Sequence, residues 1–326
     1  MTAETIVINT GAVSNVLPIP GLLESEHVVD STGIQRLEEQ PKRLGIIGGG
    51  NIGLEFASLY GRLGSQVTVF EAGSAILARY EKVAADLAQE YLEEDGVAFV
   101  VDAKVEKVAN KGQEVVLTVN GQEHTFDVVM YALGRKPATE GLGLENTDME
   151  LIERCAVKVD DYCESTVPGI YAVGDVNGGL QFTYTSLDDF RIVLGRLTGN
   201  GEYNLSKRSN VLNTLFIEPA LSQVGMTEKA AQEAGLPYQA NELRVANMPR
   251  AHVNNDLRGI YKVIVHTETK EILGATLFAR GSQELINLIK MAMVSMMSSI
   301  FKRKKTDPLE VSFFNIGIWA IRASIK

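Results

Sequence analysis

The feature that most constrains the fold of this chain is the glycine pattern Gly48-x-Gly50-x-x-Gly53, because of what stands on either side of it. An apolar run predicts a strand over 43–47, and apolar residues at helical spacing predict a helix over 52–63. A second strand is expected over 67–70. A strand, a glycine loop and a helix in this order favour a dinucleotide site, with the pyrophosphate at the helix N-terminus.

Each glycine has its own physical task in such a loop. Gly48 permits the tight turn, Gly50 lets a pyrophosphate approach the backbone, and Gly53 lets the helix pack on the strand. Glu71 follows the second strand at close to the usual spacing of ~20 residues. Its carboxylate would accept hydrogen bonds from ribose hydroxyls and repel a 2′-phosphate, which favours NAD over NADP. The alternative is a glycine-rich turn followed by a solvated glutamate.

Hydrophobic patterning predicts further elements along the chain. Before the glycine loop we expect a strand over 5–9, and after it a helix over 83–92. Four strand-like runs with short gaps then predict a small antiparallel meander, with a hairpin turn at Asn120-Gly121; the runs are 97–101, 105–108, 115–119 and 128–131. A buried strand over 169–173 ends at Gly174-Asp175 and precedes a helix over 186–197. Because ligands bind beyond the carboxyl ends of strands in α/β sheets, Asp175 is a second candidate binding residue.

The region after about residue 210 has the pattern of an α+β domain. We expect strands over 211–216, 259–266 and 272–278, and helices over 227–234 and 282–293. Thr227 and Ser282 are expected to cap the two helices.

Composition narrows the function classes. A formal net charge of −10 argues against nucleic acid or a membrane surface as partner. Two cysteines, Cys155 and Cys163, cannot build a disulfide framework, which favours a reducing, cytoplasmic setting. We see no signal peptide, and the apolar stretch 311–325 is shorter than the ~18–20 residues that a spanning helix needs. The basic run 302–305 is interpreted as a solvated face, with a lipid-surface patch as the alternative.

Four histidines show no metal-binding or catalytic spacing, so no metal site is predicted; they are His27, His124, His252 and His266. The two cysteines are interpreted as loop residues, with a redox pair as the alternative.

Several motifs occur in an order that resembles the pyridine nucleotide–disulfide oxidoreductases, the FAD- and NAD(P)-dependent relatives of lipoamide dehydrogenase and mercuric reductase. These motifs are Thr10-Gly11, the loop 48–55, 131–137, 171–175, Glu218-Pro219 and 224–228. The stretches 178–184 and 186–189 are most similar to a subgroup of bacterial flavoproteins linked to resistance to reactive chlorine.

The resemblance implies an α/β fold in which a Rossmann-like NAD-binding domain is inserted in an FAD-binding domain, followed by an α+β dimerisation domain. It implies four segments: 1–20 and 139–205 from the FAD-binding domain, 21–138 for NAD, and 206–326 for dimerisation. A homodimer is then the expected assembly, and the expected chemistry is hydride transfer from NADH to FAD and on to a disulfide, a metal ion or another small acceptor.

The resemblance also assigns roles to residues. NAD would lie against Gly48, Gly49, Gly50, Asn51, Ile52, Gly53, Glu71 and Gly134. FAD would lie against Thr10, Gly11, Asp175, Gln181, Phe182 and Thr183. Glu55 matches a supporting carboxylate that pairs with a lysine in the family.

The chain also departs from the family pattern. The family begins with another G-x-G-x-x-G and a Cys-x4-Cys pair and ends with a His-x-x-x-x-Glu element, and these are not found in this sequence. We therefore expect a truncated form with weak or absent FAD binding, no disulfide chemistry and low solubility. The alternatives are a non-catalytic NAD-binding remnant, one chain of a split flavoenzyme, or an interaction protein.

Overall fold

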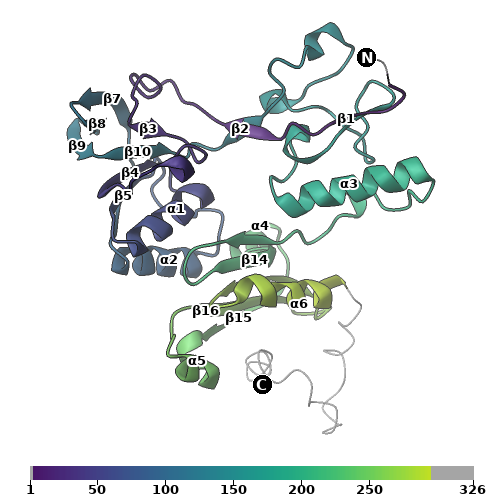
Figure 1. The fold of residues 1–326 in the computed structure, drawn as a ribbon. Helices are drawn as coiled ribbons and strands as arrows, with labels where there is room; N and C mark the ends of the chain where they lie inside the picture. The colour runs from purple at the N-terminus through teal and green to yellow at the C-terminus, as the bar shows by residue number, and fades with distance from the viewer. Residues whose placement is uncertain (1–2, 295–326) are drawn as a thin grey trace. The chain divides into compact units, whose positions relative to one another are not determined.

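The computed structural model describes residues 3–294, which divide into two compact units (Figure 1). The first unit combines the residues up to Pro18 with Ala132–Ser209. The second combines Ile19–Tyr131 with the residues from Asn210 onward. The predicted α/β fold class is confirmed, since each unit contains both strands and helices. The basic run 302–305 and the apolar stretch 311–325 lie outside the described residues.

A five-stranded parallel sheet forms the first half of the second unit, in the order β3-β10-β4-β5-β6. Its strands are β3 (Val28–Val29), β10 (Val128–Tyr131), β4 (Arg43–Ile47), β5 (Gln66–Phe70) and β6 (Val97–Val100). Two helices accompany it, α1 (Asn51–Arg62) and α2 (Lys82–Glu94). The strands and helices flanking the glycine loop thus form where the sequence predicts them. The apolar run of β4 is buried on both faces of the sheet, as is typical of parallel strands, and α1 buries Leu54 and Ala57.

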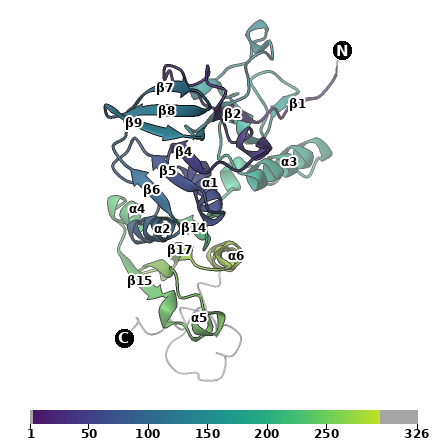
Figure 2. The same ribbon diagram turned by 60° about the vertical axis from the view of Figure 1, so that its left-hand side comes forward.

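The predicted meander is only partly correct. The runs 97–101 and 128–131 belong to the parallel sheet, as β6 and β10, and not to the meander. The meander consists of β7 (Val105–Lys111), β8 (Glu114–Val119) and β9 (Gln122–Phe126), seen side by side in Figure 2. The hairpin turn at Asn120-Gly121 is confirmed, but β9 is missing from the prediction because its residues are polar.

Aromatic packing joins the meander to the parallel sheet. Phe126 at the end of β9 meets Phe70 of β5 edge to face, with ring centroids 5.8 Å apart. The same ring lies against Gly45 of β4, where a Cβ would come within 2.8 Å of it. Gly45 therefore allows an approach that a larger residue would block.

A second sheet, antiparallel and in the order β13-β14-β17-β16-β15, completes the second unit. Its strands are β13 (Asn213–Leu215), β14 (Leu221–Gly225), β17 (Ile272–Phe278), β16 (Ile260–His266) and β15 (Tyr238–Arg244). Ile286 of α6 (Ser282–Val294) packs into the core that this sheet forms with Val224 and Leu277. The helices α4 (Glu228–Glu233) and α5 (Pro249–Asn254) lie between strands in the sequence.

The predictions for this region are only partly confirmed. The α+β character is confirmed, whereas β14, β15 and α5 were not predicted. Thr227 caps α4 as expected, since its hydroxyl accepts a hydrogen bond from Ala230 N–H at 3.1 Å. Ser282 does not cap α6: it lies within the helix, and its hydroxyl donates to the carbonyl of Ala220 at 2.6 Å.

The first unit is built around a two-stranded parallel sheet, β1 (Ile6–Ile8) with β12 (Ile170–Ala172). Two further strands pair antiparallel, β2 (Ala12–Ser14) with β11 (Arg135–Pro137). The helix α3 (Thr183–Thr198) is the long helix of this unit in Figure 1 and begins earlier than predicted. Its buried residues Ile192 and Val193 share a core with Tyr171 and Val173.

Among the described residues, no helix is long and apolar enough to cross a membrane. Short 3₁₀ turns connect the elements. The turns are Ile34–Arg36, Leu144–Asn146, Glu153–Cys155, Gly174–Asn177, Leu205–Lys207 and Val245–Asn247.

Candidate functional site

The glycine loop of the second unit has the geometry that its residue types predict. Gly48 has a φ of +111°, a conformation that favours glycine, and its N–H donates to the carbonyl of Phe70 at 2.8 Å. A Cβ on Gly53 would come within 2.0 Å of the Gly48 carbonyl oxygen, so only glycine permits this contact between helix and loop. A Cβ on Gly50, in contrast, would meet nothing within 4 Å. The open space at Gly50 lets a ligand group approach the backbone there.

Glu71 lies directly against this loop. Its Oε2 accepts a hydrogen bond from Gly49 N–H at 2.8 Å, and its Oε1 accepts one from Gly73 N–H at 2.7 Å. A carboxylate offers about four lone-pair positions. Two lone-pair positions of Glu71 therefore remain for a ligand, while the other two hold the loop. The residues at the loop thus fit an anionic pyrophosphate followed by a ribose.

A polar network fixes the start of α1. Asn51 is the first residue of the helix, followed by Ile52. The side-chain carbonyl of Asn51 accepts from the Tyr80 hydroxyl at 3.2 Å, and that hydroxyl accepts from the Asn213 amide at 2.7 Å. Burial raises the pKa of Tyr80. The network restrains the helix end whose free N–H groups make it a favourable place for an anion.

Glu55, one turn further along α1, is half-buried. Its Oε1 accepts a hydrogen bond from Phe216 N–H at 2.9 Å. Burial raises the pKa of this carboxyl above its usual value, and the hydrogen bond from Phe216 partly offsets the increase. Within the described residues, the hydrogen-bond partner of Glu55 is thus this backbone N–H.

In the first unit, the parallel pairing of β1 with β12 brings two candidate segments to one edge. Thr10-Gly11 follows β1 and Gly174-Asp175 follows β12, so both lie beyond the carboxyl ends of paired strands. The Thr10 hydroxyl donates to the carbonyl of Ala138 at 2.7 Å. Burial raises the pKa of Asp175, while Arg135 acts in the opposite direction. This edge is the position at which α/β sheets bind ligands.

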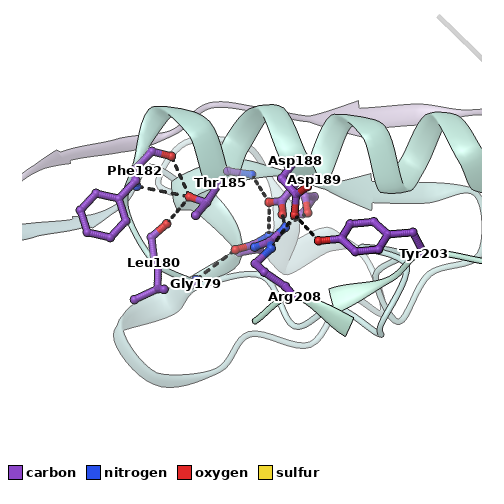
Figure 3. Close-up of polar contacts among 11 residues, drawn as sticks. Gly179, Leu180, Phe182, Thr185, Asp188, Asp189, Tyr203 and Arg208 are labelled. Atoms are coloured by element: carbon purple, nitrogen blue, oxygen red, sulfur yellow. Dashed lines mark hydrogen bonds and ion pairs between the residues drawn. The ribbon is translucent and has the colours of Figure 1, made fainter. Parts of the chain in front are cut away.

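A buried carboxylate holds the end of β12 in place (Figure 3). The Oδ2 of Asp189, on α3, accepts from Gly174 N–H at 2.7 Å and from the Asn177 amide at 3.0 Å. Its Oδ1 pairs with Arg208, whose Nε also donates to Asp188 at 2.7 Å. Gly174 has a φ of +73°, and a Cβ there would lie 2.7 Å from the Ser186 hydroxyl. These contacts therefore fix the backbone conformation at Gly174, directly before Asp175.

The predicted flavin-side residues 181–183 lead into α3. Thr183 is its first residue and Phe182 its N-cap, stacked on Tyr184 with ring centroids 5.3 Å apart. The Thr185 hydroxyl donates toward the carbonyls of Leu180 and Phe182, which lie 2.6 and 2.7 Å from it (Figure 3). Gln181 and Thr183 are exposed, so their side chains are accessible to a ligand.

Gly134 belongs to the first unit, apart from the unit that carries the glycine loop. It has a φ of +88°, and its carbonyl accepts from Asn15 N–H at 2.9 Å. A Cβ there would meet nothing within 4 Å. This position has a φ that favours glycine, and the space beside its backbone is open.

The two cysteines are free thiols in a loop region, as predicted: Cys155 is exposed and Cys163 is buried. Burial raises the pKa of Cys163 to about 12, which suppresses the reactive thiolate at neutral pH. Among the described residues, no group of three or more histidine, cysteine or acidic side chains is placed to hold a metal ion.

Some residues that hold the two sites were not predicted. Arg208 lies far from Asp189 in the sequence, and Tyr80 and Asn213 come from separate segments. No local spacing signals such contacts. Only the pair Asp188-Asp189 lies in a stretch that resembles the family, 186–189.

Comparison with known proteins extends this description. The family described as "Pyridine nucleotide-disulphide oxidoreductase" matches residues 1–189, and its dimerisation domain matches residues 211–303. A "Probable pyridine nucleotide-disulfide oxidoreductase RclA" of Escherichia coli is 45% identical over 290 residues, which are 89% of this chain and 66% of that protein. A dihydrolipoyl dehydrogenase of Chlamydia trachomatis is 33% identical over 89% of this chain and 62% of its own length.

A solved structure is also similar to this chain. The "HOCl-induced flavoprotein disulfide reductase RclA" of Escherichia coli matches with a TM-score of 0.86 and 45% identity, over 89% of this chain and 67% of that one. The chain therefore spans about two thirds of the length of the relatives that it matches.

Proposed function

The chain belongs to the pyridine nucleotide-disulphide oxidoreductase family, and on that premise we propose that it carries the nucleotide-binding and dimerisation parts of an FAD-dependent NADH:acceptor oxidoreductase. The observation that carries the proposal is the glycine loop with Glu71 hydrogen-bonded to it. Its geometry suits one ligand class, a dinucleotide, because it combines backbone N–H donors, an open approach at Gly50 and a ribose acceptor.

In this proposal residues 48–53 hold the NAD pyrophosphate on free N–H groups at the start of α1. Glu71 accepts the adenosine ribose hydroxyls and disfavours a 2′-phosphate, so NADH is preferred over NADPH. Gly134 lies against the nicotinamide half. Glu55 supports the nicotinamide end of the site through its position one turn along α1.

The FAD-side residues are Thr10, Gly11, Asp175 and the segment 181–183. The shared edge of β1 and β12 fits a flavin nucleotide: Asp175 offers a carboxylate for a polyol, and Gly11, where a Cβ would meet nothing within 4 Å, leaves the backbone accessible. When bound, the two cofactors supply hydride transfer from nicotinamide to flavin. The role of the chain is to orient them, and Asp189 does so indirectly by fixing the Gly174-Asp175 turn.

The remaining parts of the proposal concern partners and location. The acceptor is a disulfide, a metal ion or another small molecule. The antiparallel sheet with α6 forms a homodimer interface, as the dimerisation-domain match suggests. The protein works in the cytoplasm. The domains divide at residues 20, 138 and 205, with the NAD-binding domain between the first two boundaries.

The experiment is an absorbance spectrum of the purified chain, followed by NADH titration of Gly50→Ala and wild type. We expect flavin bands that are weak or lost on desalting, and NADH binding that Gly50→Ala weakens. Because the new Cβ meets nothing within 4 Å, a loss of NADH affinity would report on the ligand and not on folding. The change at the helix N-cap by itself costs about 1 kcal/mol of stability. Equal NADH affinity of the two proteins would contradict the assignment of the loop.

A second candidate function is an NAD-binding protein without turnover. The observation that favours it is the state of the thiols: the pKa of Cys163 is raised to about 12, and Cys155 is the other cysteine of this sequence. A colourless protein that binds NADH but reduces no disulfide would support this alternative.

A further inference from the structure

The side chains around the start of α1 form a closed ring of three hydrogen bonds, which we call the α1 ring. The Asn213 amide donates to the Tyr80 hydroxyl at 2.7 Å, and that hydroxyl donates to the side-chain carbonyl of Asn51 at 3.2 Å. The Asn51 amide in turn donates to the side-chain carbonyl of Asn213 at 3.5 Å. Each side chain thus donates once and accepts once. Hydrogen bonds linked in this way polarise and strengthen one another.

The α1 ring joins three segments of the second unit that are far apart in the sequence. Asn51 is the first residue of α1, Tyr80 lies just before α2, and Asn213 is the first residue of β13 in the antiparallel sheet. Tyr80 is only 9% exposed. Breaking the α1 ring therefore leaves polar atoms with little access to water and without a partner, which costs free energy.

Two further contacts hold α1 against the segment 213–218. The Glu55 carboxylate accepts from Phe216 N–H at 2.9 Å, and Arg62 lies 3.5 Å from Glu218. The three residues of α1 in these contacts and in the α1 ring are spaced four and seven residues apart, which puts them on one face of the helix. The direction of α1 is therefore tied to the segment 213–218 along most of its length.

The free N–H groups at the start of α1 are the proposed donors to the NAD pyrophosphate, and their use to an anion depends on where they point. We propose that Tyr80 and Asn213 are positioning residues of the dinucleotide site, which set the direction of these N–H groups through Asn51. This inference rests on the proposed function, since NADH is taken as the ligand of the loop. The loop lies in residues 1–189 and Asn213 in residues 211–303, which match two different family descriptions. The dinucleotide site is thus built from both parts of the chain.

The experiment measures NADH affinity by fluorescence titration of the full chain as wild type, Tyr80→Phe, Asn213→Ala and the double variant. Each single change breaks the α1 ring, so we expect each to bind NADH about fivefold more weakly. The double variant should bind about as weakly as the single variants, because all three changes remove the same ring. ADP-ribose, which has the pyrophosphate without the nicotinamide, should lose affinity by the same factor.

Two matched controls separate positioning from a purely structural role. Tyr60→Phe removes a different hydroxyl, on α1 itself, that donates to the carbonyl of Ile34 at 3.2 Å. Thr214→Val removes the hydroxyl next to Asn213 in β13, which bonds with the Ser222 hydroxyl at 2.9 Å. Each control loses a hydrogen bond but leaves the α1 ring intact. Both should therefore bind NADH like wild type.

Hydrogen exchange of the ligand-free proteins gives a second readout. The Leu54 N–H donates to the Gly50 carbonyl at 3.0 Å in the first turn of α1. Its exchange should be about fivefold faster in Tyr80→Phe and Asn213→Ala, and unchanged in the two controls. If one variant of the α1 ring fails to fold by circular dichroism, the other provides the comparison.

The possible outcomes distinguish this inference from the proposed function. Wild-type affinity for NADH in both variants of the α1 ring, additive losses in the double variant, or equal losses in the controls would each overturn the positioning role alone. A wild-type chain that binds no NADH would overturn the proposed function and this inference with it.

Discussion

The Oδ2 atom of Asp189 accepts a hydrogen bond from the backbone N–H of Gly174 at 2.7 Å, although the two residues belong to different elements. Asp189 is 2% exposed, and its second oxygen pairs with Arg208. A buried carboxylate is tolerated here because a cation and two N–H donors surround it. The consequence is a fixed strand end directly before Asp175, the residue proposed for the flavin side.

Replacing Asp189 by alanine should destabilise the protein by about 3 kcal/mol, because it leaves the Arg208 guanidinium and the Gly174 N–H without their buried partner. Urea unfolding monitored by circular dichroism measures the change. The control is Glu140→Ala, which removes an exposed pair with Lys136 and should change stability by well under 1 kcal/mol. Equal effects of the two changes would show that the Asp189 network contributes little.

A second buried ion pair lies within the other unit. The ammonium of Lys262 on β16 lies 2.9 Å from Glu81 and 2.5 Å from Glu228, and the side chains of Lys262 and Glu81 are 6% and 5% exposed. Lys262 holds the pKa of Glu228 below its usual range. Glu81 also accepts a hydrogen bond from Glu228 N–H.

Lys262→Met should therefore cost about 3–5 kcal/mol, since it leaves the Glu81 carboxylate buried without a cation. The double variant Lys262→Met/Glu81→Gln should regain part of that loss, because the glutamine carbonyl can still accept from Glu228 N–H. Denaturant unfolding of the wild type, the two single variants and the double variant gives the coupling energy. Additive effects would exclude a direct interaction of this strength.

The parts of the fold that follow from local pattern could be predicted from the sequence. The strand 43–47, the helix after it and the hairpin at Asn120-Gly121 depend on periodicity and turn chemistry, which lie within a few residues of one another. The pairing partner of a strand depends on distant residues. Local pattern therefore predicts the runs 97–101 and 128–131 in the meander, although their hydrogen bonds join them to the parallel sheet.

The same distinction applies to the candidate sites. The glycine loop and Glu71 form one local motif, and the structure places them in contact. The residues that brace the sites come from separate segments, as Asn213 does for Tyr80 and Arg208 does for Asp189. Polar β9 shows a further limit: hydrophobic alternation cannot identify a strand whose exposed face dominates its composition.

Glu55 leads to a prediction about pH. Burial raises the pKa of its carboxyl in the folded protein above the unfolded value of 4.5. The folded state then binds the proton more tightly, so the free energy of unfolding falls as the pH rises from about 4.5 through the raised pKa. Glu55→Gln keeps an acceptor for Phe216 N–H and removes the ionisation.

We expect Glu55→Gln to be more stable than wild type at pH 7 and equal to it at pH 4. Thermal unfolding across this range measures the difference, with the exposed Glu90→Gln in α2 as control. A constant difference at all pH values would show that burial of the charge is not its cause.

The last prediction concerns the preference for NADH. Glu71→Arg replaces the proposed ribose acceptor by a cation that can pair with a 2′-phosphate. The ratio of NADPH to NADH affinity should rise by about tenfold or more, which is about 1.4 kcal/mol. Fluorescence titration with each nucleotide measures it. Because Glu71 also accepts hydrogen bonds from Gly49 and Gly73, Glu71→Gln serves as control: it should weaken both nucleotides with a smaller change in their ratio. A ratio that stays constant in Glu71→Arg would show that this carboxylate supports the loop and does not contact the ribose.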